Sequence, residues 1–190
     1  MPSTDSTPSP GAAASAPAMT SAAMSAGTPP AAGASAQPVH FADDSARLAH
    51  LTRICASAGF NRWAGFEVVR ASAEEVLLAM PWRDEAGQYS GFLHAGLIGA
   101  LLDTVSGFAA SAHTGQRVMA SHFAVNCLAP AAGRHFVARG RVVKAGRKQI
   151  FARAELHAHD SDANAGDGSG RGPGKLVATG EVIFVPVSGA

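Results

Sequence analysis

One stretch of the chain, residues 91–112, constrains the fold more than any other. It is apolar and glycine-rich, and Asp103 is its only Asp, Glu, Lys or Arg. Helices that are apolar on most sides are usually buried, and an isolated carboxylate is costly there unless it is paired, hydrogen-bonded or protonated. We therefore predict a long buried helix in which Asp103 has a local purpose. Catalysis is one such purpose, and pairing with an arginine in close helix packing is the alternative.

The first part of the chain differs in composition from the rest. Of the 190 residues, 1–38 are almost all Ala, Ser, Pro, Gly, Thr and Met, with Asp5 as the only charge. Such a segment buries too little apolar surface to offset its ordering entropy, so we predict a disordered tail. Residues 39–190 then form one domain, in which the Gly/Asp/Ser/Asn-rich segment 159–174 is a flexible hairpin insertion.

Several classes of protein are disfavoured by the composition. The tail has no Lys or Arg and no leucine-rich segment, so it does not resemble an export signal. His94 and Asp103 interrupt the longest apolar run, which argues against a membrane span. A net charge of +1 gives no argument for nucleic-acid binding. Cys55 and Cys127 fit a reducing compartment, with a disulfide between them as the alternative. We expect a cytoplasmic protein without nucleic-acid or membrane partners.

The order of the predicted elements indicates the fold class. Apolar spacing predicts a helix over 44–58 ended by Gly59, a hairpin of 66–70 and 75–82, and the long helix from 91 or 94 to 111. Four strands follow, over 118–128, 136–144, 149–157 and 176–187. This pattern predicts an α+β fold, in which a six-stranded antiparallel sheet wraps around one long central helix.

The start of the long helix offers a second chemical group. If the helix begins near His94, the N–H of Gly96 is unpaired at the positive end of the helix dipole and can donate to a carbonyl oxygen. Losing such a donor to an oxyanion typically costs about 3 kcal/mol. Asp103 lies roughly 10 Å further along the same helix. We therefore predict a site that is shared across a dimer interface. Residues in this segment do not have the spacing of metal ligands.

These residues carry a resemblance to a known family. Gln88-Tyr89-Ser90-Gly91-Phe92-Leu93-His94-Ala95-Gly96, followed by Leu102-Asp103, resembles the loop-and-helix signature of hotdog-fold acyl-CoA thioesterases, above all the phenylacetate-degradation (PaaI-like) type. Segments 125–130, 140–147 and 178–182 are similar to that family's strands. The resemblance covers roughly residues 45–187 and implies the hotdog fold, which agrees with the element order.

The resemblance also implies a role for each matching residue. Asp103 would be the catalytic carboxylate, as nucleophile or as general base on water. The N–H of Gly96 would polarise the thioester carbonyl, and His94 would support that loop. Gln88 would orient the water or the acid, and Ser121 would assist from the following strand.

The chain departs from the family pattern at a few positions. Gln88 stands where Asn is commoner, and Ala95 stands where the first of two glycines is common. Ala120 is an alternative match for the assisting residue at Ser121. A longer amide can still orient water, and Ala95 is compatible with a helix.

A basic turn is the remaining candidate. Lys144, Arg147 and Lys148 surround a turn and would either contact the phosphates of coenzyme A, as basic turns in this family do, or form a solvated hairpin end. The resemblance implies no metal and no cofactor, because coenzyme A is part of the substrate. It implies a homodimer or homotetramer.

Three functions follow from these observations. The resemblance implies an enzyme that hydrolyses acyl- or aryl-CoA to the free acid and coenzyme A. A hydratase or dehydratase of the same fold would require a second acid near His94, which the motif lacks. A non-catalytic acyl-CoA binding module would gain nothing from the isolated Asp103.

Overall fold

The computed structural model describes residues 37–160 and 174–187. All but the last two residues of the predicted disordered tail, and most of the predicted insertion, lie outside these residues. The described elements, in chain order, are α1 (Asp44–Ser57), α2 (Gly59–Ala64), β1 (Glu67–Ala71), β2 (Val76–Pro81), the single 3₁₀ turn η1 (Asp84–Ala86), α3 (Ala95–Thr114), β3 (Val118–Cys127), β4 (His135–Ala145), β5 (Ile150–His159) and β6 (Lys175–Pro186). The predicted order of helices and strands is confirmed.

The N-terminal helices show one correction. α1 begins as predicted, because the Asp43 carboxylate accepts a hydrogen bond from the Ala46 N–H at 2.9 Å. Gly59 does not simply end this helix. The chain turns at the extended Ala58, and Gly59 begins the short helix α2, which sequence analysis missed. α2 ends at Gly65, whose φ of 71° lies in the left-handed region that glycine tolerates.

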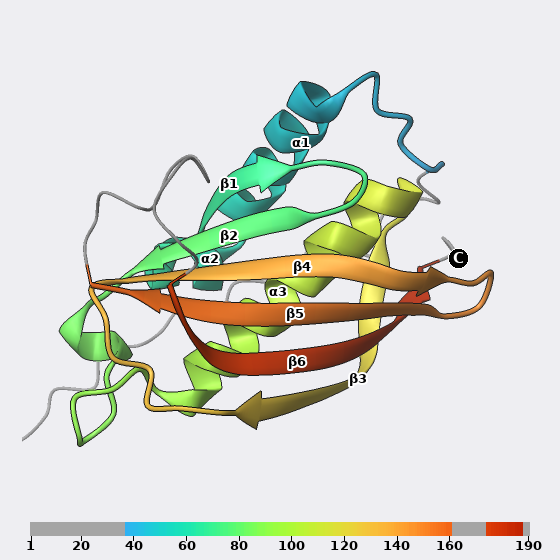
Figure 1. Ribbon diagram of the computed structural model, residues 1–190. Coiled ribbons are helices and arrows are strands. Elements are labelled where there is room, and N and C mark those ends of the chain that lie inside the picture. The colour runs from blue at the N-terminus through green and yellow to red at the C-terminus, as the bar shows by residue number, and fades with distance from the viewer. Residues whose placement is uncertain (1–36, 161–173, 188–190) are drawn as a thin grey trace, which may run out of the picture. The chain divides into compact units, whose positions relative to one another are not determined.

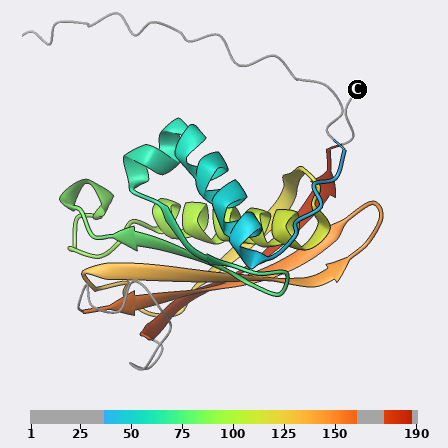
Figure 2. The same ribbon diagram turned by 90° about the horizontal axis from the view of Figure 1, so that it is seen from above.

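The strands form one six-stranded antiparallel sheet in the order β1-β2-β4-β5-β6-β3. The sheet curves around α3 (Figure 1). In the view from above, α3 lies between the sheet and α1 (Figure 2). This is the predicted α+β hotdog arrangement, and it leaves β1 and β3 as the two edge strands of the sheet.

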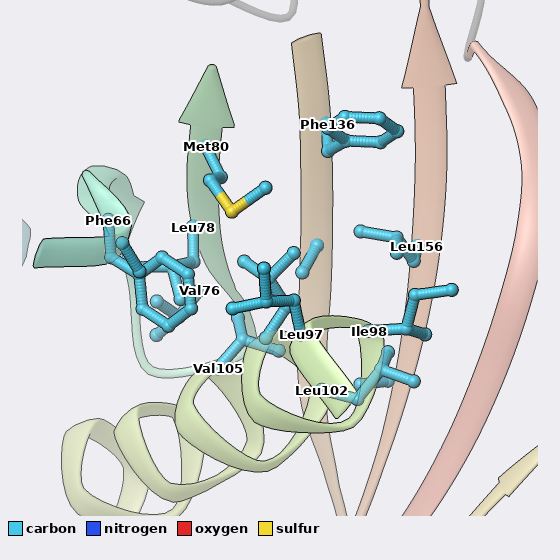
Figure 3. Close-up of a cluster of buried hydrophobic side chains, with 14 of the residues drawn as sticks. Phe66, Val76, Leu78, Met80, Leu97, Ile98, Leu102, Val105, Phe136 and Leu156 are labelled. Atoms are coloured by element: carbon cyan, nitrogen blue, oxygen red, sulfur yellow. The ribbon is translucent and has the colours of Figure 1, made fainter. Parts of the chain in front are cut away.

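The core lies between α3 and the concave face of the sheet. Leu101, Leu102 and Val105 of α3 are fully buried. Figure 3 shows side chains of this core together: Phe66, Val76, Leu78, Met80, Leu97, Ile98, Leu102, Val105, Phe136 and Leu156. By length and hydropathy α3 could cross a membrane, but half of that stretch is buried inside the protein, as expected for a core helix.

One glycine allows α3 to lie directly on the sheet. A Cβ atom at Gly140 of β4 would stand 2.6 Å from the carbonyl oxygen of Val105. Real Cβ atoms do not approach backbone atoms that closely, so any side chain at this position would push the helix from the strand. The position of α3 on β4 is therefore fixed by backbone contact.

The outer face of the sheet carries a paired carboxylate. Glu75, which is 9% exposed, accepts hydrogen bonds from Nε and Nη2 of Arg141 at 3.2 and 2.8 Å. Arg70 and Arg139 stand 3.3 and 3.8 Å from its oxygens. Burial alone would raise the pKa of Glu75, but the hydrogen bonds from Arg141 and the three positive charges outweigh it and lower the pKa.

Candidate functional site

The loop before α3 is held by backbone hydrogen bonds. The Gln88 N–H donates to the Phe92 carbonyl at 2.8 Å, and the Leu93 N–H donates to the Ala131 carbonyl at 3.0 Å. Gly91 adopts a φ of 76°, which explains a glycine at this position. The side-chain Oε1 of Gln88 accepts from the Ser90 N–H at 2.6 Å. The Nε2 amide of Gln88 is therefore the side-chain group that can donate a hydrogen bond to an acceptor outside the loop.

His94 caps the N-terminus of α3. Its Nδ1 accepts a hydrogen bond from the Gly96 N–H at 2.9 Å. Because Nδ1 is the acceptor, the neutral ring carries its proton on Nε2. The imidazole thus offers one donor, Nε2–H, to its surroundings.

This cap corrects the premise from which the role of Gly96 was predicted. The N–H of Gly96 was expected to be unpaired, but His94 occupies it. The N–H groups of Leu97 and Ile98 donate to the His94 carbonyl at 2.9 and 3.1 Å. Within the described residues, the N–H of the exposed Ala95 has no hydrogen-bond partner. Ala95 therefore carries the available amide at the positive end of the helix.

A cavity of about 710 Å³ lies beside this helix start. Its walls come from the loop before α3, the first turn of α3 and the segment after β3, and contain Gln88, Tyr89, Phe92, Leu93, His94, Ala95, Ile98, Cys127, Leu128, Ala129, Pro130 and Ala131. Apart from His94 and Gln88 this wall is mostly apolar. The structure thus brings Gln88, His94 and Ala95 to one cavity.

Asp103 is isolated, as its sequence context predicts. Its Oδ1 is shut off from solvent, and no described residue donates a hydrogen bond to it or pairs with it as a cation. Burial raises the pKa of the Asp103 carboxyl above its ordinary value. The alternative interpretation, in which an arginine neutralises Asp103, does not hold within the described residues. A partly buried carboxylate with a raised pKa and no described partner is typical of a functional site.

A second cavity, of about 300 Å³, contains Asp103. Its walls come from α1, α3, the start of β3 and β6, and contain Leu51, Ile54, Asp103, Thr104, Gly107, Phe108, Ser111, Arg117, Val118, Ala120 and Phe184. None of the residues around the first cavity lines this one. Within one protomer, Asp103 therefore does not meet His94 or Ala95.

Ser121 lies outside both cavities. It is the extra residue of a β-bulge between Ala120 and His122, and its hydroxyl donates to the Ile183 carbonyl at 3.1 Å. Ala120 lines the Asp103 cavity instead. Of the two alternative matches, Ala120 lines the cavity that contains Asp103, and the Ser121 hydroxyl donates to the neighbouring strand.

The basic turn is also apart from the loop cavity. Lys144, Arg147 and Lys148 are exposed and line neither cavity. The β4–β5 turn lies at the end of the sheet opposite the loop before α3 (Figure 1). In the described residues, no group of three or more His, Cys, Asp or Glu side chains could hold a metal ion. Cys55 is a buried free thiol and Cys127 an exposed one.

Sequence reasoning missed two residues of these cavities. Ala95 was passed over because the helix was predicted without its side-chain cap. The position of His94, two residues before Gly96, was the signal that could have indicated this cap. Arg117 was missed because it lies in a short connection between elements and reaches the Asp103 cavity only through the tertiary fold.

Comparisons with known proteins show which proteins this chain resembles. The family model of the thioesterase superfamily matches residues 90–164. A thioesterase family protein from Silicibacter pomeroyi is 30% identical, with a TM-score of 0.64, over 75% of this chain and 99% of that one. A search of curated protein sequences gives no match.

More distant structures share the fold. A thioesterase from Haemophilus influenzae is 20% identical, with a TM-score of 0.63, over 80% of this chain and 94% of that one. Zebra fish thioesterase superfamily member 2 is 24% identical, with a TM-score of 0.59, over 73% and 94%.

Fold and site together define a hotdog protein with a helix-start amide and an isolated carboxylate on its central helix. The match to the family model and the 30% identity with a relative covered almost completely establish the family. The chain belongs to the thioesterase superfamily. Membership supports thioester hydrolysis as its general activity.

Proposed function

We propose that this protein is an acyl-CoA thioesterase whose active site forms between two copies of the chain. The observation that carries this proposal is the buried Oδ1 of Asp103, which has no partner among the described residues. Leaving a carboxylate unpaired costs stability. A general base or nucleophile needs such a carboxylate, because a salt bridge would lower its basicity.

The second copy supplies the amide. Ala95 lies eight residues before Asp103 on the same helix, which separates the two groups by roughly 12 Å along its axis. One thioester carbonyl cannot contact both groups of one protomer. In the proposed dimer, Asp103 of one protomer faces Ala95 and His94 of the partner subunit.

The edge strand β3 supports this dimer. β3 has no neighbour on its outer side within the described sheet, so its outward N–H and C=O groups are available for pairing. Met119 and Phe123 of β3 are 62% and 53% exposed. Large exposed apolar side chains along an open edge favour burial against another chain, and we propose β3 of a second copy. The family resemblance adds two such dimers as a tetramer.

The proposed chemistry uses three groups. The Ala95 N–H and the His94 Nε2–H hold the thioester carbonyl oxygen and stabilise the oxyanion. Asp103 takes a proton from water while the water oxygen bonds to the carbonyl carbon. The C–S bond then breaks, sulfur leaves with the electron pair, and Asp103 returns the proton to it. The products are the free acid and the thiol of coenzyme A.

A nucleophilic route differs in one bond. Asp103 would itself bond to the carbonyl carbon, expel the thiolate and form an anhydride that water hydrolyses. A single turnover in ¹⁸O-labelled water can distinguish the two routes. If water attacks the acyl carbon of the anhydride, the label enters the product acid, as it does in the general-base route. If water attacks the carboxyl carbon of Asp103, the label enters the protein. Label in Asp103 by mass spectrometry would therefore establish the nucleophilic route.

The decisive experiment measures release of free thiol from a panel of acyl-CoA esters. We expect Asp103→Asn to lose about 10²–10⁴-fold in kcat while remaining folded and oligomeric. Asp44→Asn, which changes an exposed carboxylate paired with Arg47, is the matched control and should retain activity. Wild-type rates in Asp103→Asn, or hydration of enoyl-CoA without thiol release, would contradict the proposal.

A further inference from the structure

The cavity that contains Asp103 runs along α3 and reaches a cation. The wall residues on α3 after Asp103 follow helical spacing and are Thr104, Gly107, Phe108 and Ser111. Ser111 lies roughly 12 Å beyond Asp103 along the helix axis. Arg117, immediately before β3, lines the same cavity. The cavity is therefore lined both by a carboxylate residue, Asp103, and by a cationic residue, Arg117, which come from different parts of the chain.

The backbone of Arg117 is held by a hydrogen bond, and its side chain is exposed. Its carbonyl accepts a hydrogen bond from the Val187 N–H at 2.9 Å. Its exposed guanidinium makes no hydrogen bond or ion pair with any described residue. The surrounding segments 115–119 and 184–187 contain no Asp or Glu. An anion of another molecule therefore meets no competing carboxylate from these segments.

The basic turn lies at the same end of the sheet. Ile150, at the start of β5, pairs with Phe184 of β6, and Phe184 pairs with Ala120 of β3. The β4–β5 turn and Arg117 are thus two strand spacings apart, roughly 10 Å. Both views place this turn beside the C-terminal end of α3 (Figures 1 and 2). Arg117 and the turn form a cationic end of the domain.

This inference rests on the proposed function. The coenzyme A part of an acyl-CoA substrate matches the length and the polar groups of this cavity. Its pantetheine arm is about as long as four extended residues, roughly 13 Å, and separates the thioester from the phosphates. The apolar cavity offers the Thr104 and Ser111 hydroxyls to the two amides of this arm. We propose that the arm lies along α3 in the Asp103 cavity and that Arg117 binds a phosphate of coenzyme A. The acyl group then occupies the mostly apolar cavity at Tyr89 and Phe92.

The assignment can be tested by comparing two thioesters of the same acyl group as substrates. The acyl-CoA carries the phosphates, and the acyl ester of N-acetylcysteamine lacks them. We expect Arg117→Gln to raise KM for the acyl-CoA about tenfold, with kcat nearly unchanged and both constants for the short ester unchanged. Arg117→Lys keeps the charge and should recover part of this loss. Arg153→Gln is the control, because Arg153 pairs with Glu181 and lines neither cavity.

The outcomes separate this inference from the proposed function. A KM that is unchanged for both esters, or raised equally for both, overturns the role of Arg117. If the wild-type protein hydrolyses neither ester, the proposed function fails, and calorimetry with coenzyme A and pantetheine decides the remaining question. Weaker binding of coenzyme A alone by Arg117→Gln then supports phosphate recognition, and equal binding overturns it.

Discussion

Two carboxylates in this domain stand in opposite situations. Glu75 is buried on the outer face of the sheet among Arg70, Arg139 and Arg141, and these charges lower its pKa. Asp103 lies on the central helix without a partner among the described residues, and burial raises its pKa. Both groups lose part of their contact with water on folding, but among the described residues only Glu75 gains protein partners in exchange.

The difference separates a structural charge from the charge that we propose to be functional. Glu75 joins the β1–β2 hairpin to β4 through its arginines, so its charge stabilises the sheet. Asp103 contributes no comparable contact and costs stability wherever it is ionised. A charged group that lowers stability and makes no stabilising contact indicates a site selected for chemistry.

The largest expected effect tests whether Asp103 acts as a base. Because burial raises its pKa, it accepts a proton at higher pH than an ordinary aspartate. We expect kcat/KM for an acyl-CoA to fall about tenfold per pH unit below that raised pKa, because the protonated acid is inactive. A pH–rate profile measures this. Activity that stays constant down to the ordinary range of aspartate would break the assignment.

Removing the charge of Glu75 should cost stability. We expect Glu75→Gln to lower the free energy of unfolding by about 1–3 kcal/mol, because Arg141 loses its charged acceptor. The exposure of the three arginines limits the effect. Chemical denaturation measures it, with the exposed Glu67→Gln of β1 as the control. A loss no larger than that of the control would show that the cluster adds nothing to stability.

Acid should weaken the domain through Glu75. Its pKa is lower in the folded than in the unfolded state, so its contribution is complete above the unfolded value. It decreases as pH falls through the folded pKa. We expect the stability difference between wild type and Glu75→Gln to shrink over this acidic range in thermal melts. A difference independent of pH would contradict the electrostatic origin.

The smallest effect has the opposite sign. Asp103 has a higher pKa in the folded than in the unfolded state, so its penalty appears as pH rises above the unfolded value. We expect Asp103→Asn to be more stable than wild type at neutral pH and equally stable below that value. Thermal melts at the two pH values measure the gain. A loss of stability at neutral pH would mean that the carboxylate is paired after all.

Much of the fold could be predicted from local sequence patterns. The long apolar run, the alternating strands and the stop at Gly115 predicted α3 and the six strands within a few residues. α2 was missed because a six-residue helix has too few turns for a periodic signal. The cluster around Glu75 was also missed, because the pairing of β2 with β4 brings together residues far apart in the chain.

The site could be predicted less completely. Asp103 was found because its charge contrasts with an apolar helix. The hydrogen bond that occupies the Gly96 N–H was missed, because a side-chain cap depends on the rotamer of His94 as well as on spacing. The path from Asp103 to Arg117 exists only once α3 and β3 lie side by side, so no local pattern contained it.

The backbone contact at Gly140 has a further consequence for regulation. Since the close approach at Gly140 seats α3 directly on its own sheet, we expect the gap between the carboxylate and the opposing amide to depend on how two molecules associate. On the proposed function, specific activity then depends on protein concentration. Dilution below the dissociation constant of the dimer would switch the enzyme off without unfolding either molecule.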